Sequence, residues 1–443
     1  MDAPVLPCWR SRWLPRNWWW RDVREVVVLN RRAFLSLVGG AAATSAVGAG
    51  AWAGLLRERV EDAAAVAVGG GSVSGRVLVV LQLDGGNDGL NTLVPSDGRY
   101  RDARPKLALP EADLVRVRAD GFALHPGLTP LAARWDAGRI AAFEGIGQRN
   151  QSRSHFKAMD VWWAGTDGSA STTGWLGRWL DATEGSSPNP LRSISLGTGA
   201  PALVGSRSLP TVVLSPSRFA LAAPARTDAA AITAAFLATS APGGAGGDVW
   251  LDAARAAIPT TIEAIDLVDR ARVDDPDVDL VTGRVNENTA SALLQTAAGI
   301  IELGVGTQVL LVGVNGFDTH SNQLIVHDEL LRDVAAGITA FFDRLEAAGL
   351  ADNVLLVTTS EFGRRVAENA SEGTDHGFAG AQFVMGAGVR GGRVVGDAGL
   401  GALVDGDLPI GIDTRSLYAV ALDWLGGPTD DVLGGSFDRY GLI

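Results

Sequence analysis

From Arg76 onward, short apolar runs alternate with polar, glycine-containing segments. The runs are continuous in Val, Ile and Leu, which is typical of strands buried on both faces in a parallel sheet. They are VLVVLQLD, RIAAFEGIG, QVLLVGV, NVLLVTT and QFVMGAG. Helical patterns separate them, and the longest, from Gln323 to Leu350, should break at Gly337 and end near Gly349. The pattern predicts an α/β fold, a doubly wound, mainly parallel sheet with helices on both faces.

The central part of the chain has a different composition. Residues 165–220 are rich in Gly, Ser, Thr and Pro, and residues 220–305 read as mostly helical. We therefore expect a Gly/Ser-rich and helical insertion around 165–305 within one large domain at 68–443. The length and the 47% hydrophobic content suit a large globular body of this kind.

The N-terminal region is expected to direct export. Residues 1–30 form a basic, Trp-rich extension, and in 31–67 the pair Arg31-Arg32 precedes a weakly apolar Ala/Gly stretch, as in a bacterial twin-arginine signal. A membrane anchor is the alternative, because the run approaches the ~20 residues that span a bilayer. Its Gly, Ala, Ser and Thr content makes it a poor membrane helix. We predict that the chain uses the export machinery and reaches the periplasm or the extracellular space. In its mature form it is expected to have no stable membrane span.

Charge and cysteine usage narrow the possible partners. The formal net charge is −12, which argues against nonspecific binding to nucleic acid because such binding needs a basic surface. The single cysteine, Cys8, lies in the N-terminal extension, so no disulfide can form within the body. This cysteine usage fits a protein that folds before it is exported.

Carboxylates and imidazoles follow the predicted strands at their carboxyl ends, where open α/β sheets bind ligands. Asp318 and His320 in GFDTHSNQ are an i, i+2 pair at a strand end and should point to the same side. Asp375 and His376 in GTDHGFAG are adjacent, and glycines on both sides allow a sharp loop. The alternative for each pair is a turn-forming Asp with a hydrogen-bonded His.

Two further acids fall at the same predicted edge. Glu361 follows NVLLVTT, and its alternative role is that of an acid at a helix N-terminus. Asp88 lies in GGNDGLN, with Asp84 just upstream, where Asp, Asn and Gly also suit an ordinary loop. Mixed carboxylate and imidazole ligands favour a divalent metal: Zn, Mn, Mg or Ca. The candidate metal ligands are Asp88, Asp318, His320, Glu361, Asp375 and His376.

Three residues are candidates for catalysis. Ser154 and His155 open a helical pattern in SRSHFKAMDVWW, where Ser154 could be a nucleophile beside the cation or simply a helix N-cap. Arg364, in SEFGRR, could clamp an oxyanion bidentately or start a solvated helix. His125 and His327 have a structural or supporting role in this interpretation.

In combination, several segments resemble a twin-arginine-exported bacterial family catalogued as domain of unknown function fifteen-oh-one. They are LDGGNDGLNTLVP, SRSHFKAMDVWWAG, GWLGRWL, GFDTHSNQ, TTSEFGRRVAENAS and GTDHGFAGAQFVMGAGVRGG. The resemblance covers residues 76–440. That family is grouped with the alkaline phosphatase and sulfatase superfamily, whose members hydrolyse or transfer phosphate and sulfate esters at a two-metal site.

The resemblance implies an alkaline phosphatase-like domain and a role for each matching position. Asp88 or Asp84 would be the early acid, and Ser154 the nucleophile. Asp318 and His320 would supply a ligand pair, Glu361 would stand at the Asp of an Asp-His pair, and His376 near the late His. The chain departs from the superfamily pattern at Glu361-Phe362, where an imidazole is missing, and it lacks the sulfatase Cys/Ser-x-Pro-x-Arg signature.

Two functions are compatible with these residues. One is an exported metal-dependent hydrolase of phosphate or sulfate esters, acting on a small anionic ester or a glycan at the carboxyl edge of the sheet. The other is a noncatalytic exported protein that binds a glycan, surface polymer or partner through the same face.

Overall fold

The computed structural model describes residues 75–119, 121–150, 152–169, 171–184, 189–221, 228–240, 249–273, 277–278, 285–286 and 288–443. The predictions for the extension at 1–30 and the signal at 31–67 lie outside the described residues. Among the helices that are described, none is both long and apolar enough to cross a membrane.

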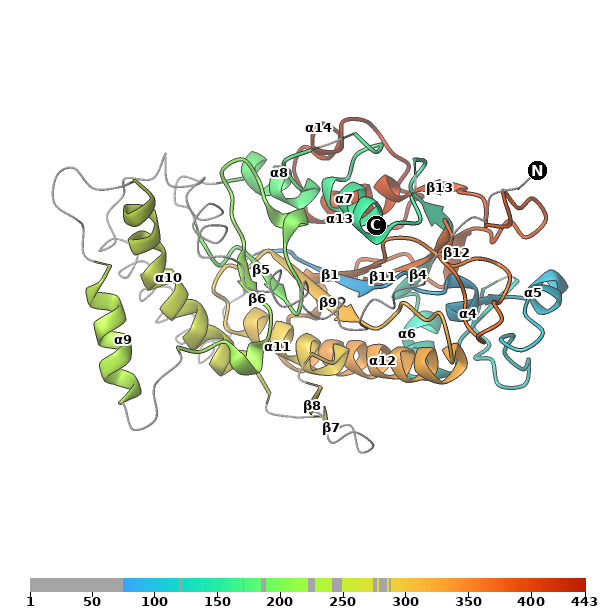
Figure 1. Ribbon diagram of the computed structural model, residues 1–443, viewed down its shortest axis with the longest axis horizontal. Helices are drawn as coiled ribbons and strands as arrows, with labels where there is room; N and C mark the ends of the chain where they lie inside the picture. Colours follow the sequence, from blue (N-terminus) through green and yellow to red (C-terminus); the bar gives the residue numbers. More distant parts are fainter. Residues whose placement is uncertain are drawn as a thin grey trace, which may run out of the picture.

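A nine-stranded sheet forms the centre of the molecule (Figure 1). Its order is β12 (Arg393–Gly396), β4 (Ile140–Gly147), β11 (Gly380–Gly386), β10 (Val354–Thr359), β1 (Val77–Asp84), β9 (Val309–Asn315), β5 (Ser193–Leu196) and β6 (Thr211–Val213), with β13 (Ile412–Asp413) beside β4. Only β11 runs antiparallel to its neighbours. The five apolar runs became β1, β4, β9, β10 and β11, which confirms the predicted mainly parallel sheet.

Helices cover both faces of the sheet (Figure 1). One face packs against α6 (Ala132–Asp136), α10 (Val249–Ala271), α11 (Ala290–Glu302) and α12 (Gln323–Ala347). The other packs against α7 (His155–Ala164), α8 (Trp175–Ala182), α13 (Thr414–Leu425) and α14 (Thr429–Leu433). Successive residues of β1 enter opposite cores, Val77 and Val79 one and Leu78 and Val80 the other, because strand side chains alternate in direction. The two-sided burial explains the unbroken apolar runs.

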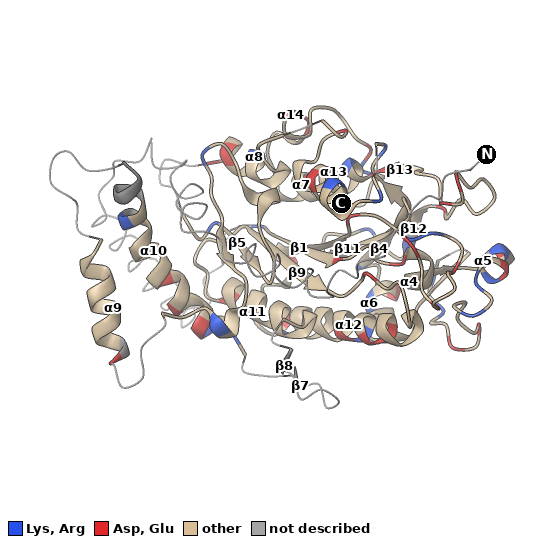
Figure 2. Cartoon of the chain, viewed as in Figure 1, with Lys and Arg blue, Asp and Glu red and all other residues tan. Residues whose placement is uncertain are grey.

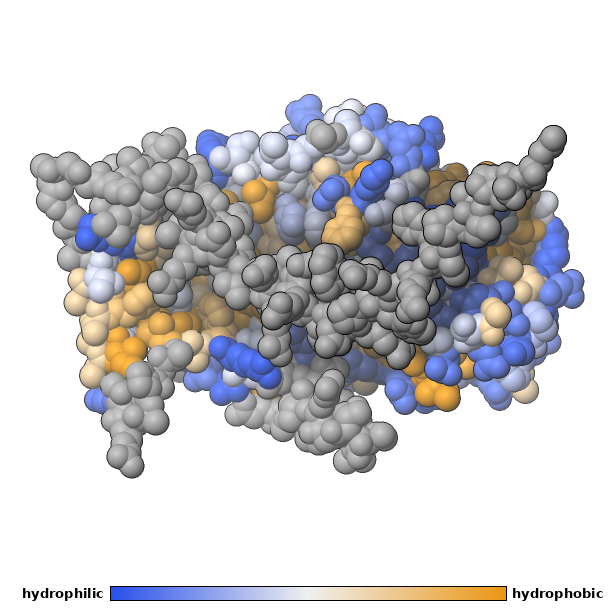
Figure 3. All heavy atoms as spheres, in the orientation of Figure 1, coloured by the Kyte–Doolittle hydropathy of each residue, from blue (hydrophilic) through white to orange (hydrophobic). Residues whose placement is uncertain are grey.

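Smaller elements lie around this core. Near the carboxyl end of β1 these are α4 (Gly89–Thr92), α5 (Gly98–Ala103) and the hairpin of β2 (Leu93–Pro95) and β3 (Phe122–Leu124). At the other end of the molecule, α9 (Ala229–Ala238) contains no charged residue, and Figure 2 shows it in tan with red only at its lower end, where the N-cap Asp228 precedes it. Figure 3 shows apolar residues gathered over this end, where Leu237 is exposed. The candidate ligands lie elsewhere, in segments that follow the central strands.

Two expectations about the fold require correction. The range 165–305 is not wholly an insertion, because it contributes the parallel strands β5 and β6 to the main sheet. Helix α12 does not break at Gly337: a Cβ there would lie 2.9 Å from Cα of Ser291, so this glycine allows close packing against α11. Gly349, with φ of +70°, follows the end of α12 as expected.

Candidate metal centre

The carboxyl ends of the central strands bring the candidate ligands together. In the register of the sheet, Asp84 at the end of β1 pairs with Asn315 at the end of β9. Asp318 follows β9 by three residues, and Glu361 follows β10 by two. Because β1, β9 and β10 are parallel neighbours, their loops leave the same edge of the sheet, as the sequence predicted.

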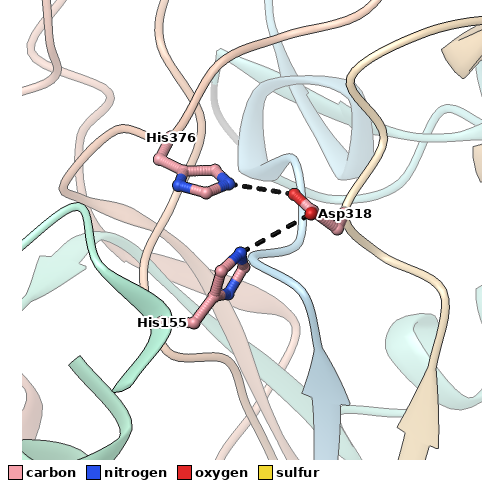
Figure 4. Close-up of side chains that lie close together, drawn as sticks. All are labelled: His155, Asp318 and His376. Carbon is pink, nitrogen blue, oxygen red and sulfur yellow. Dashed lines mark hydrogen bonds and ion pairs between the residues drawn. The ribbon is translucent and has the colours of Figure 1, made fainter. Parts of the chain in front are cut away.

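Asp318 lies at the centre of a cluster of three imidazoles. Its Oδ1 is 3.0 Å from Nε2 of His376 and 3.1 Å from Nε2 of His320. Its Oδ2 is 3.5 Å from Nε2 of His155. Figure 4 shows His155, at the start of α7, and His376 pointing at the Asp318 carboxylate from different segments. Residues widely spaced in the chain therefore bring three imidazoles to the two oxygens of one carboxylate.

The other ring nitrogen of each histidine faces an acceptor. Nδ1 of His155 lies 2.9 Å from Oε1 of Glu361, and Nδ1 of His376 lies 2.8 Å from the carbonyl oxygen of Arg153. Nδ1 of His320 is 3.4 Å from Oδ1 of Asp375. Carbonyls and ionised carboxylates only accept hydrogen bonds, so they place the proton of each neutral ring on Nδ1. The Nε2 lone pairs are left directed towards Asp318.

This donor set fits a divalent cation. Zinc binds imidazole nitrogen and carboxylate oxygen at about 2.0–2.2 Å, which places neighbouring ligand atoms of a tetrahedron on the order of 3.3 Å apart. The Asp318 oxygens lie 3.0–3.5 Å from the three Nε2 atoms, and the Nε2 atoms of His320 and His376 lie 2.9 Å apart. Single atoms of His155, Asp318 and His376 all lie within 4.8 Å of one another. Mixed nitrogen and oxygen donors suit Zn²⁺ or Mn²⁺ better than Ca²⁺, which prefers oxygen alone.

Glu361 was expected to be a metal ligand, but its carboxylate has a different role. Its carboxylate is buried and accepts the Gly85 backbone N–H at 2.9 and 3.0 Å as well as the His155 ring. Both oxygens are thus engaged with the protein, and Glu361 orients the imidazole that faces the cluster. Asp375 is more exposed and also accepts from Asn369, which lowers its pKa. Its carboxylate faces His320 from the side away from Asp318.

Arg364 does not have the geometry of an oxyanion clamp. Its buried guanidinium donates to the carbonyls of Gly85, Gly86, Phe317 and Thr374. It also donates to Oδ1 of Asp318 at 2.6 Å. Burial alone would raise the pKa of Asp318, but the hydrogen bond from Arg364 and its positive charge oppose that effect, and the pKa is lowered. Arg364 therefore holds the ligand loops together and keeps Asp318 ionised.

Asp88 likewise does not join the cluster. Its carboxylate is 1% exposed and forms two hydrogen bonds with the buried guanidinium of Arg104, at 2.6 and 3.0 Å. Burial would raise the pKa of Asp88, but Arg104 lowers it overall. The alternative early acid, Asp84, lies in the same cleft as His155, Asp318 and Glu361. Burial raises the pKa of Asp84 to about 7, and the charge of Glu361 adds to this effect.

Of the other residues considered in the sequence analysis, Ser154 is exposed, whereas His125 and His327 are buried. Ser154 is the exposed N-cap of α7, and within the described residues its hydroxyl makes no hydrogen bond with the clustered side chains. His125 and His327 are buried, and desolvation lowers the pKa of the first to about 4 and of the second to about 3. These two histidines are uncharged and structural at neutral pH.

An open cleft of about 410 Å³ extends from the cluster. Helix α7 lines it with His155, Met159 and Trp163, which are four residues apart and thus share one helix face. Across the cleft are the strand-end residues Asp84 and Asn315. The sequence analysis did not single out Met159 or Trp163, although their spacing from His155 was a usable signal.

The mainly parallel sheet with helices on both faces makes the protein a member of the α/β class. One similar solved structure is a protein in the alkaline phosphatase superfamily from Vibrio parahaemolyticus, at 9% identity, with a TM-score of 0.39, covering 83% of this chain and 70% of that one. Another is the phosphonate monoester hydrolase SpPMH from Silicibacter pomeroyi, at 11% identity, with a TM-score of 0.37 and coverage of 83% and 76%. A third, Ps i-CgsB in complex with k-i-k-neocarrahexaose, has 12% identity, a TM-score of 0.40 and coverage of 83% and 75%.

The family model described as "Protein of unknown function (DUF1501)" matches residues 76–408, and the chain belongs to this family. A search of curated proteins finds no match.

Proposed function

We propose that this protein is an exported metal-dependent hydrolase of phosphate or sulfate esters. Its cation would be held by Asp318, His155, His320 and His376. The observation that carries the proposal is the convergence of three imidazole Nε2 atoms on one carboxylate, with each opposite nitrogen facing an acceptor. Oriented lone pairs of this kind are typical of metal ligands supported by neighbouring acceptors.

The charge of the cleft supports a requirement for a cation. The described residues that line it include the acids Asp84, Asp318 and Glu361 and no Lys or Arg. An anionic ester would be repelled by these carboxylates. A bound divalent cation would supply the positive charge that neutralises the ester oxyanion and polarises the bond to be cleaved.

A group that can exchange a proton at neutral pH lies in the same cleft. Asp84, which is half-buried at the end of β1, has its pKa raised to about 7 by desolvation. A carboxyl with such a pKa suits general acid or base catalysis, provided that it reaches the substrate. Asp84 is our candidate for proton transfer, in place of Asp88.

The geometry favours attack by water over attack by Ser154. A serine nucleophile needs a base within hydrogen-bonding reach, and no such bond links the Ser154 hydroxyl to the clustered side chains in the described part of the chain. Ser154 nonetheless adjoins His155, so a covalent route through Ser154 is the competing mechanism.

The function is tested with the purified mature protein and a panel of aryl phosphate, phosphonate and sulfate esters. Hydrolysis should disappear with chelator and return with Mn²⁺ or Zn²⁺. His320→Ala should remove it, whereas Asp343→Asn, an exposed acid of α12 outside the cleft, should behave as the parent. If no ester is cleaved and no divalent cation binds, the hydrolase proposal fails and the noncatalytic binding protein replaces it.

A further inference from the structure

One buried amide connects the loops that carry the proposed ligands. Gln323 is the first residue of α12 and is completely buried. Its Nε2 donates to Oδ2 of Asp88. Its Oε1 accepts from the hydroxyl of Thr319 at 3.0 Å and from the hydroxyl of Thr374 at 2.7 Å. Three loops from three strand ends therefore share one side chain.

The two threonines are next to the ligands. Thr319 lies between Asp318 and His320, and Thr374 comes two residues before His376. The backbone also joins the two loops, since the Thr374 N–H donates to the Thr319 carbonyl at 3.1 Å. Any shift of Thr319 relative to Thr374 would change the 2.9 Å distance between the Nε2 atoms of His320 and His376.

The direction of the amide is set by Asp88. Because Asp88 is ionised and held by Arg104, it can only accept, so Gln323 must turn its NH₂ group to it. The carbonyl of Gln323 is thereby aimed at the two threonine hydroxyls. A glutamate at 323 would oppose the Asp88 carboxylate, and a methionine would fill the volume without making the three bonds.

We propose that Gln323 is a positioning residue for the metal centre and that the buried Asp88–Arg104 pair orients it. This proposal rests on the proposed function, because the ligands that it positions are those of the proposed cation. It also accounts for the GGNDG motif: Asp88 acts through Gln323 on the two ligand loops. Loss of interactions that orient metal ligands typically lowers metal affinity about 10–100-fold.

The experiment compares Gln323→Met with the parent in two measurements. Titration calorimetry with Mn²⁺ should show affinity reduced about 10–100-fold. Amide hydrogen exchange of the metal-free protein should accelerate together in residues 317–322 and 372–377. Thr374→Val keeps the side-chain shape and removes one of the three hydrogen bonds of Gln323. It should give smaller changes in Mn²⁺ affinity and in exchange. This variant replaces Gln323→Met if Gln323→Met fails to fold.

A charge exchange and a matched control sharpen the test. Gln323→Glu should weaken Mn²⁺ binding more than Gln323→Met, and adding Asp88→Asn should recover part of the loss, because the glutamate would then face an amide and not a second carboxylate. Tyr100→Phe removes a hydroxyl that donates to Asn91, another partner of Arg104, without touching either ligand loop. It should lower the melting temperature and leave Mn²⁺ affinity and loop exchange unchanged.

The outcomes separate the two proposals. Parent-like Mn²⁺ affinity and exchange in folded Gln323→Met would overturn the positioning role and leave the metal centre standing. If the parent itself binds neither Mn²⁺ nor Zn²⁺, the proposed function fails. In that case amide hydrogen exchange alone tests the role of Gln323. Faster exchange in both loops of Gln323→Met, but not of Tyr100→Phe, supports the positioning role. Unchanged exchange in Gln323→Met rejects it.

Discussion

The Nε2 atoms of His320 and His376 lie 2.9 Å apart, although the two residues are 56 positions apart in the chain. The carbonyl of Arg153 accepts from Nδ1 of His376, so a neutral His376 ring has no proton on Nε2. Two nitrogens and the Asp318 carboxylate at this separation require a positive species among them, either a proton or a cation. The supporting acceptors around all three rings favour a cation.

The acceptors behind the rings should contribute unequally to metal affinity. Glu361 is buried and lies 2.9 Å from the His155 ring, whereas Asp375 is exposed and lies 3.4 Å from His320. Glu361→Gln should therefore reduce Mn²⁺ or Zn²⁺ affinity about 10–100-fold, and Asp375→Asn should reduce it only a few-fold. Calorimetric titration of both variants measures this. Equal losses would mean that burial of the acceptor does not determine its contribution.

Glu144 should make the stability of the protein depend on pH. This residue of β4 is fully buried, and burial raises its pKa from 4.5 to about 8. Between these values the folded state holds a proton that the unfolded chain releases, so the free energy of unfolding falls as pH rises through this window. Glu144→Gln cannot ionise and should lose this part of the decline.

Urea denaturation of both proteins from pH 5 to pH 8 measures the difference. The stability of Glu144→Gln relative to the parent should rise by about 2–4 kcal/mol across this range. A constant difference would show that Glu144 is already ionised in the folded state at pH 5.

The sequence was most informative where burial is two-sided. Continuous apolar runs located five strands, and their ends located Asp318, Glu361, His320 and His376 at one edge. It was least informative where an element is short. β5 and β6 have only four and three residues within a Gly- and Ser-rich region, so their composition resembled a loop.

The roles of the charged residues depended on contacts between distant segments. Asp84 is the last residue of β1, and Asp88 comes four residues later. Between them, Gly85 and Gly86 adopt positive φ and turn the chain. As a result, Asp84 lies in the cleft and Asp88 lies beside Arg104. Nothing in the local sequence of Arg364 indicates that carbonyls from two other loops and from Thr374 of its own loop surround it. Such partners become visible only in the folded chain.

Export should depend on the paired arginines that precede the Ala/Gly stretch. Replacing Arg31 and Arg32 with Lys is expected to retain the precursor in the cytoplasm, because the twin-arginine route requires both guanidinium groups. Cell fractionation and immunoblotting of the two forms provide the measurement. Undiminished recovery of the Lys-Lys form outside the cytoplasm would refute this route.

Ser154→Ala distinguishes the two hydrolytic routes. If water attacks the ester, removal of this exposed hydroxyl should change kcat by less than about 10-fold, because among the described residues it makes no hydrogen bond with the clustered side chains. If Ser154 is the nucleophile, kcat should fall by at least three orders of magnitude, on the scale of other nucleophile deletions. Steady-state kinetics on the best ester of the panel, with His320→Ala as the inactive reference, separates these outcomes.

The most direct test is the metal content of the purified mature protein, measured by elemental mass spectrometry beside that of His376→Ala. His376 contacts Asp318, His320 and the Arg153 carbonyl at once, so its removal should open the site. The account predicts about one equivalent of Zn or Mn per chain in the parent and little in the variant. No divalent metal in the parent after loading and desalting, or equal metal in both proteins, would contradict it.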